Sequence, residues 1–334
     1  MSINTMYNPP LYQGRRKKRS YFEGWYFKQT VQHQSGGKGM DVIAIIPGVS
    51  MDKDGVKHAF IQVFSSFEEK TWYISYPFSS FTAAKKAMHI TIEKNSFTEE
   101  GISLDIDYQD LHLKGFLKFT DREKFPRKIL APGIMGWYSF VPFMECFHGV
   151  VSLKHTVNGT LSINERVIDF KSGSGYIEKD WGVSFPTAWV WMQSCDFLDK
   201  KSSCMLSVAR IPFLGRVFTG FLGFVWYNDK LLRFGTYTGA KILSLNADKG
   251  CINVVISQGK TLIEFSAEMG VSGHLAAPRQ GKMDRIIQES LNGSISVTIS
   301  TAGKDKEKTT LFSDIGRLAG LEVSEIEKIT IGNN

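Results

Sequence analysis

The residues best suited to chemistry lie in one run near the middle of the 334-residue chain, residues 173–193. In an extended strand alternate side chains share a face, so Tyr176, Glu178 and Asp180 project together. Two carboxylates roughly 7 Å apart repel as anions when they are screened from water, so one of them would keep its proton near neutral pH. A retained proton is what a general acid needs. Taken alone, however, the Glu-Lys-Asp-Trp-Gly run is more typical of a tight turn with a solvated ion pair.

Aromatic residues accompany these acids. After a Phe-Pro break, Trp189, Trp191 and Gln193 share the next strand face, which predicts an aromatic wall with an amide in it. Near the N-terminus, Glu23 and Trp25 share a face of the first predicted strand. A third acid is therefore also expected beside tryptophan.

This central run resembles the signature of the tocopherol cyclase-like family, Tyr-x-Glu-x-(Asp/Asn)-Trp-Gly-x-x-Phe-Pro-x-x-Trp-x-Trp-x-Gln. The matching residues are Tyr176, Glu178, Asp180, Trp181, Gly182, Phe185, Pro186, Trp189, Trp191 and Gln193. Residues 21–28 are similar to the family's Phe-Glu-Gly-Trp-Tyr-Phe element. A third similar element holds Ala277, Pro278, Gly281, Met283, Arg285, Glu289 and Gly293. The resemblance covers roughly residues 20 to 325.

The resemblance implies a reaction. Family members cyclise a prenylated quinol to a chromanol, and related carotenoid hydratases add water to an isoprenoid double bond. Both reactions protonate an alkene to a tertiary carbocation, which needs a desolvated acid and aromatic faces that stabilise a cation by up to ~2 kcal/mol. The expected acid is Asp180, then Glu178, then Glu23. The expected substrate-binding residues are Trp25, Tyr176, Trp181, Trp189, Trp191, Gln193 and Trp137.

Neither a cofactor nor a metal is expected for this chemistry, and the sequence has no Gly-rich phosphate loop and no HExxH pattern. Two other functions stay open. A non-catalytic carrier of an isoprenoid or another apolar ligand would use the same aromatic residues without an acid. A membrane-associated scaffold with a basic arm would need neither.

The elements that position these residues are predicted to be strands. About sixteen short segments with alternating or β-branched apolar residues follow one another at hairpin spacing. An Asn158-Gly159 turn predicts the clearest hairpin, over residues 151–163, and only residues 313–329 have a helical alternative.

The predicted fold class is therefore all-β. The two halves open with a similar aromatic-x-aromatic step, and the family resemblance implies two lipocalin-like domains, antiparallel barrels or curved sandwiches side by side. The expected organisation is a basic arm over residues 1–20, a first β domain over 21–185 and a second over 186–334. The central motif would then fall at the boundary between domains, where pockets often form.

The segment before the central motif, residues 131–149, is apolar, aromatic and interrupted by glycine and proline, so it cannot be regular throughout. It is either a buried loop or a mobile lid over a lipid-like ligand. Trp137 lies in it. Glu145 and His148 are its only titratable residues, and such a pair is more often structural than catalytic.

Composition sets the remaining bounds. With 43% hydrophobic and 22% charged residues the chain can bury a large core. No apolar run reaches the ~18 residues of a membrane span and no signal peptide is evident, so a cytoplasmic location and four reduced cysteines are expected. The chain has a net charge of +7. Its densest run of basic residues is Arg15, Arg16, Lys17, Lys18 and Arg19. This cluster is expected to be solvated, with a weak peripheral membrane contact ranked second, and no nucleic-acid motif accompanies it.

Overall fold

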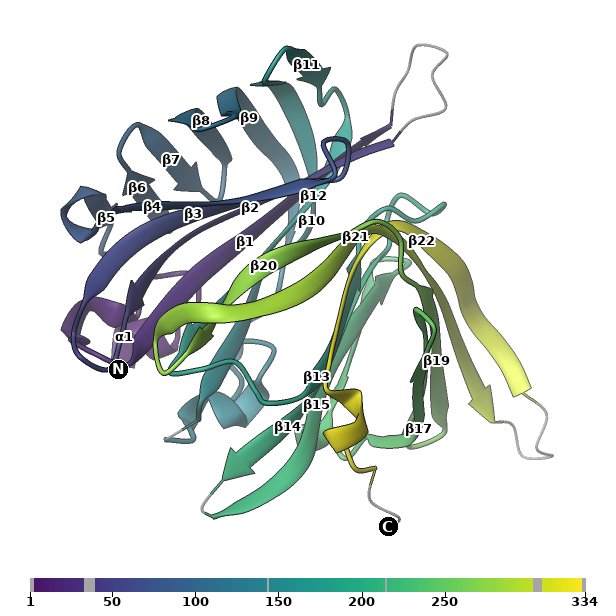
Figure 1. The fold of residues 1–334 in the computed structure, drawn as a ribbon. Helices are drawn as coiled ribbons and strands as arrows, with labels where there is room; N and C mark the ends of the chain where they lie inside the picture. The colour runs from purple at the N-terminus through teal and green to yellow at the C-terminus, as the bar shows by residue number, and fades with distance from the viewer. Residues whose placement is uncertain (1–2, 33–39, 143, 214, 303–307, 332–334) are drawn as a thin grey trace. The chain divides into compact units, whose positions relative to one another are not determined.

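A computed structural model describes residues 3–32, 40–142, 144–213, 215–302 and 308–331 (Figure 1). The chain divides into two compact units. The first comprises Met1–Phe185 and His274–Ile287, and the second comprises Pro186–Gly273 and Gln288–Asn334. The division thus falls between Phe185 and Pro186, but a later segment of the chain returns to the first unit.

The first unit is built on one twelve-stranded antiparallel sheet with the order β4-β3-β2-β1-β12-β10-β9-β8-β7-β6-β5, and β11 pairs with β10. Its central strands are β1 (Tyr21–Gln32), β12 (Gly173–Gly182) and β10 (Cys146–Ile163). The others are β2 (Met40–Met51), β3 (Lys57–Ser65), β4 (Lys70–Pro77), β5 (Phe81–Ala83), β6 (His89–Ile92), β7 (Asn95–Thr98), β8 (Gly101–Tyr108), β9 (Leu111–Lys124) and β11 (Arg166–Asp169). Short helical turns are α1 (Ile3–Met6), η1 (Gly14–Arg16), η2 (Phe78–Ser80) and η3 (Gly136–Phe140).

Register decides which side chains of this sheet share a face. Opposite Trp25 of β1 lies Lys179 of β12, and opposite Tyr26 lies Glu178. Trp25, Phe27, Ile177 and Trp181 belong to the buried core of the unit, so we call their side the inner face. The alternate residues, Tyr176, Glu178 and Asp180 among them, project from the outer face.

The second unit has a ten-stranded antiparallel sheet with the order β16-β15-β14-β13-β22-β21-β19-β18-β17, and β20 pairs with β21. The strands of this sheet are β13 (Trp189–Ser194), β14 (Ser203–Phe213), β15 (Arg216–Tyr227), β16 (Lys230–Gly235), β17 (Lys241–Asp248), β18 (Cys251–Gln258), β19 (Thr261–Glu268), β20 (Ser272–Arg279), β21 (Lys282–Ala302) and β22 (Lys308–Ser324). Residues 274–287, which form most of β20 and the start of β21, belong to the first unit. The turns η4 (Thr236–Thr238) and η5 (Ile326–Lys328) complete the second unit. Val190, Met192, Leu206 and Leu321 lie in its core.

The predicted all-β class is confirmed, since strands hold 68% of the residues and helical turns 6%. Among the described residues no helix is long and apolar enough to cross a membrane. The helical alternative for the C-terminal segment is wrong, because residues 308–324 form β22.

The predicted hairpin turn at Asn158 and Gly159 is also wrong, because β10 continues straight through it. Gly159 has φ +128°, and a Cβ there would lie 2.2 Å from the carbonyl oxygen of Phe116 on β9. This glycine therefore permits a close approach of two strands and does not reverse the chain.

Candidate functional site

Three ionisable side chains meet on the outer face of the first sheet. The registers of β10 and β12 place His148 opposite Asp180 and Val150 opposite Glu178. The Nδ1 atom of His148 lies 2.8 Å from Oδ1 of Asp180, and its Nε2 atom lies 3.4 Å from Oε2 of Glu178. The imidazole thus lies between the two carboxylates that the sequence singled out, and Glu178 is almost completely buried.

The electrostatics of this cluster favour a charged imidazole. Burial lowers the pKa of His148, but the carboxylates of Asp180 and Glu178 outweigh burial and raise that pKa from 6.5 to about 10. We therefore expect His148 to hold a proton at neutral pH. The hydroxyl of Tyr176 donates a hydrogen bond of 2.6 Å to Oε2 of Glu178, which extends the cluster along β12.

Such a cluster can give and take protons, because a bound proton has several neighbouring acceptors. The ligand atoms of His148, Glu178 and Asp180 also lie within 4.8 Å of one another, as in some metal sites. An imidazolium has no lone pair to donate, however, so metal binding would first require His148 to lose its proton. The geometry thus allows proton transfer, and it allows metal binding once that proton is lost.

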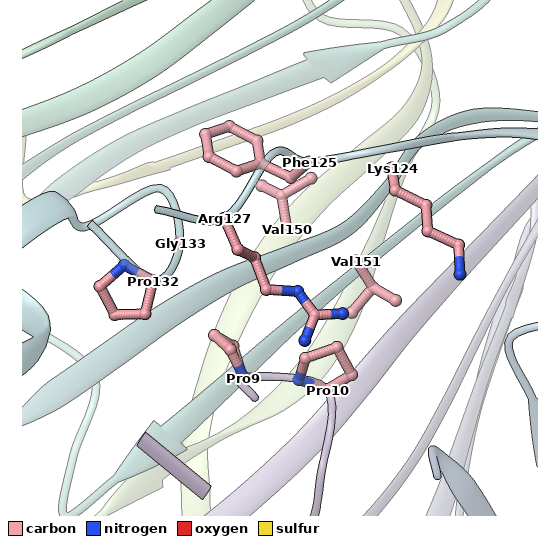
Figure 2. Close-up of a pocket in the computed structure, with 9 residues that line it drawn as sticks. All are labelled: Pro9, Pro10, Lys124, Phe125, Arg127, Pro132, Gly133, Val150 and Val151. Atoms are coloured by element: carbon pink, nitrogen blue, oxygen red, sulfur yellow. The ribbon is translucent and has the colours of Figure 1, made fainter. Parts of the chain in front are cut away.

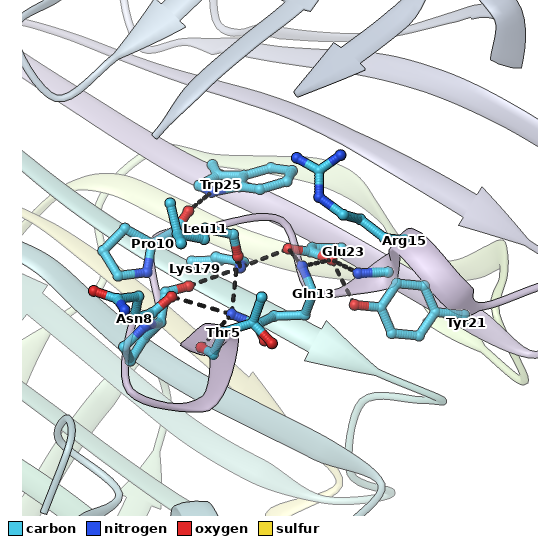
Figure 3. A network of polar contacts seen from close by, with 12 residues as sticks. Thr5, Asn8, Pro10, Leu11, Gln13, Arg15, Tyr21, Glu23, Trp25 and Lys179 are labelled. Carbon is cyan, nitrogen blue, oxygen red and sulfur yellow. Dashed lines mark hydrogen bonds and ion pairs between the residues drawn. The ribbon is translucent and has the colours of Figure 1, made fainter. Parts of the chain in front are cut away.

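Glu23 lies on the opposite, inner face and does not join this cluster. It is fully buried, its Oε1 atom lies 2.5 Å from Nζ of Lys179, and Tyr21 donates a hydrogen bond to it (Figure 3). The backbone N–H groups of Gln13 and Gly14 also donate to its carboxylate. The carboxylate thus has a buried counter-ion and three further hydrogen-bond donors.

Lys179 is the counter-ion, and it is flanked by aromatic rings. Its Nζ atom lies 4.9 Å from the ring centroid of Trp25 and 4.6 Å from that of Trp181. It donates to the carbonyl oxygens of Pro9 at 2.7 Å and Leu11 at 2.5 Å (Figure 3). The three N–H groups of the ammonium thus have three acceptors, and the N-terminal segment is tied to the inner face.

The N-terminal arm accordingly has two parts. Residues 9–14 are buried, and the indole N–H of Trp25 donates to the carbonyl oxygen of Pro10. The five basic residues that follow are exposed, as expected for a solvated cluster. The guanidinium of Arg15 donates to the carbonyl oxygens of Ala83 and Ala84.

The tryptophans predicted to bind substrate lie in both units. Trp25 and Trp181 lie in the core of the first unit, on either side of Lys179. Trp189 and Trp191 lie on β13 of the second unit, outside its core cluster. The remaining predicted binding residue of the first unit, Trp137, is 51% exposed in η3.

In the second unit, alternation places Trp189, Trp191 and Gln193 on one face of β13. The indole N–H of Trp189 donates to Oε2 of Glu322 at 2.7 Å. Glu322 lies opposite Trp191 on one side and opposite the fully buried Glu289 on the other. The predicted aromatic wall therefore has two carboxylates beside it that the sequence analysis did not select.

One pocket of the first unit lies beneath the N-terminal segment, between Pro9, Pro10, Val150 and Val151 (Figure 2). It has room for about one water molecule, which is too little for a prenylated quinol.

The sequence analysis mentioned His148 but did not include it among the predicted site residues. The missing signal was the β10–β12 register, because only that register places the imidazole opposite Asp180. Lys179 was missed for the same reason, since its partner Glu23 is distant in sequence.

The site and fold define a class of protein, an all-β chain in two antiparallel units that carries a buried imidazole–carboxylate cluster. The tocopherol cyclase-like family model matches residues 124–325, so the chain belongs to that family. The matched residues include the whole cluster but begin after Glu23 and Trp25. A search of curated protein sequences finds no match.

Solved structures share the fold. An AttH from Nitrosomonas europaea has a TM-score of 0.50 at 10% identity, with 90% of this chain and 92% of that chain covered. CghA with Sch210972 has a TM-score of 0.53 at 9% identity, with 94% and 89% covered. A second crystal structure of CghA has a TM-score of 0.55 at 8% identity, with 94% and 90% covered. Likeness at such low identity concerns the fold alone.

Proposed function

We propose that this protein is an acid catalyst for an isoprenoid substrate, which it cyclises or hydrates after protonating an alkene. The preferred substrate is a prenylated quinol. The observation that carries the proposal is the imidazole of His148 between the carboxyl groups of Asp180 and Glu178. Membership of the tocopherol cyclase-like family supports the substrate class.

In the proposed reaction the proton that His148 and Asp180 share is delivered by the Asp180 carboxyl group to the less substituted carbon of a trisubstituted alkene. The tertiary carbocation that results is attacked by the phenol oxygen of the quinol, or by water in a hydration. His148, 2.8 Å away, is left neutral, so it is the base that can hold the returning proton. The attacking oxygen then loses one proton, and the cluster takes it up. One proton leaves the cluster and one returns, so no other reactant is needed.

The surroundings of the acid suit a cationic intermediate. Tyr26 lies opposite Glu178, and Tyr176 lies two residues before it, so both phenol rings share the outer face with the cluster. Aromatic faces stabilise a desolvated cation by up to ~2 kcal/mol. Trp189, Trp191 and Gln193 of the second unit stay predicted substrate-binding residues, as the family signature implies.

The alternative is a carrier that binds an apolar ligand without converting it. CghA, which is similar in fold, has been solved with the compound Sch210972, so the fold is compatible with an organic ligand. The carrier and the catalyst differ in one respect that an experiment can separate: only the catalyst transfers a proton to carbon.

The test incubates the purified protein with a geranylgeranyl-substituted hydroquinone in D₂O and analyses the product by mass spectrometry. A cyclised product carries one deuterium on carbon, and a hydrated product in addition gains the mass of one water. Asp180→Asn should lower turnover by about 10²–10⁴-fold while thermal stability and ligand retention stay near those of the parent.

The matched control is Asp107→Asn. Asp107 also lies 2.9 Å from a histidine, His112, but both side chains are mostly exposed. This variant should keep full turnover. If the parent retains the quinol without converting it, the protein is a carrier. If Asp180→Asn loses about 1 kcal/mol of stability and keeps its activity per folded molecule, Asp180 is a structural residue.

A further inference from the structure

A short apolar tip projects from the first unit between β9 and β10. Lys128 and Ala131 exchange two backbone hydrogen bonds, of 2.9 and 3.0 Å, which closes a two-residue turn. The residues in the turn are Ile129 and Leu130, and their side chains are 80% and 78% exposed. Two adjacent apolar side chains held this far into solvent call for an explanation.

The base of this turn is firmly held, so the exposure is not that of a loose loop. Phe125, Ile134 and Met135 are buried. The guanidinium of Arg127 donates to the side-chain oxygen of Asn8 at 2.6 Å. Figure 2 shows Arg127, Pro132 and Gly133 gathered around Pro9 at this base. A packed base with an unpacked apolar tip is an arrangement that presents the tip to a partner.

The charged residues that adjoin the tip in sequence, Arg127 and Lys128, are both basic, and Lys124 at its base is paired with Glu99. Residues 124–144 contain Lys124, Arg127 and Lys128 and no aspartate or glutamate. Trp137, nine residues after Lys128, is half exposed. Apolar side chains, an interfacial tryptophan and flanking cations are the combination by which proteins bind the surface of an anionic bilayer.

We propose that residues 124–141, named here the tip loop, dock this protein on anionic lipid membranes. Ile129 and Leu130 enter the interface, Lys128 meets the phosphates, and Trp137 lies at the level of the headgroups. The tip is much smaller than the roughly 800 Å² per partner of a stable protein interface, and two aliphatic side chains have no role in binding a nucleic-acid backbone. The inference is independent of the proposed reaction, although a membrane is where prenyl lipids reside.

The first experiment measures binding of the full chain to vesicles of phosphatidylcholine with phosphatidylglycerol by co-sedimentation. The double variant Ile129→Ser with Leu130→Ser should weaken binding at least tenfold, because two buried apolar side chains are lost from the bound state. Lys128→Glu should weaken it by at least about fivefold, and pure phosphatidylcholine should bind less. The matched control, Val167→Ser with Ile286→Ser, removes two side chains of the first unit that are 69% and 64% exposed and should bind as the parent does.

The second experiment uses the tryptophans as reporters. All seven lie in the described residues, and the six besides Trp137 are at most 8% exposed. Lipids brominated near the headgroup should therefore quench mainly Trp137, and Trp137→Phe should remove most of the quenching.

Three results would overturn the proposal. The tip and control variants could bind vesicles equally well. Binding could depend only on the five basic residues at 15–19 and not on the tip. The tip variant could convert a dimer to a monomer without changing vesicle binding, which would make the tip a contact between two copies of the chain.

Discussion

Replacing Lys179 with methionine tests whether the buried ion pair with Glu23 organises the first unit. The ammonium is fully buried and has three acceptors, the carbonyl oxygens of Pro9 and Leu11 and the carboxylate of Glu23. Methionine has a similar length and would fill the space between the two tryptophan rings. It would leave the Glu23 carboxylate buried without its counter-ion.

The expected loss is about 3 kcal/mol of unfolding free energy. Removing one partner of a buried ion pair costs roughly 3–5 kcal/mol. The lower end applies here, because two backbone N–H groups and the Tyr21 hydroxyl still donate to Glu23. A domain is stable by roughly 5–15 kcal/mol, so the change is large enough to measure. Adding Glu23→Gln should recover part of the loss, since it removes the unpaired charge.

The assay is urea unfolding, with hydrogen–deuterium exchange of residues 8–14 read by mass spectrometry. Exchange there should rise strongly in Lys179→Met, since the two carbonyl contacts are lost. Lys114→Met is the control, because Lys114 forms an exposed ion pair 3.5 Å long with Asp105 and should change stability by less than about 0.5 kcal/mol. A loss below about 1 kcal/mol in Lys179→Met, with residues 8–14 still protected, would refute this reasoning.

Two pH predictions follow from buried histidines. The pKa of His148 is raised to about 10 in the folded protein, so its stabilisation is complete below about pH 6.5 and is lost as the pH rises toward 10. In urea unfolding, the stability of His148→Gln should therefore fall less than that of the parent between pH 7 and 10. An equal fall in the two proteins would contradict the raised pKa of His148. Burial lowers the pKa of His155 to about 3, with a smaller contribution from Arg122, so the folded protein should lose a few kcal/mol as the pH falls from 6.5 toward 3. In the same assay, His155→Gln should lose less stability than the parent as the pH falls from 6.5 toward 3. An equal loss in the two proteins would assign the acid sensitivity to other groups.

Alternation within single strands was predictable from the sequence, because it depends only on neighbouring residues. Tyr176, Glu178 and Asp180 do share a face of β12. The all-β class followed for the same reason, since strand periodicity and turn residues recur along the whole chain. The aromatic pattern of residues 176–193 also sufficed to indicate the family.

Contacts between distant segments were decided by the tertiary structure. Whether Glu23 joins Asp180 depends on the face that each occupies, and the β1–β12 register places Glu23 opposite Trp181 on the inner face. His148 becomes the partner of Asp180 only because β10 pairs with β12 at that register. A shift of one residue would reverse every such assignment, and no local pattern specifies the register between strands so far apart in sequence.

The N-terminal arm and Gly159 also show that a local sequence pattern does not specify tertiary contacts. A Pro-Pro segment before a basic run is typical of a solvated tail, but residues 9–14 are buried because Lys179 and Glu23 bind their backbone groups. An Asn-Gly pair is typical of a turn, but the close approach of β9 keeps Gly159 inside a strand. The sequence by itself determined which residues could alternate, turn and carry charge. The tertiary structure decided which of them meet, because buried charges and tight backbone contacts select partners across the whole sheet.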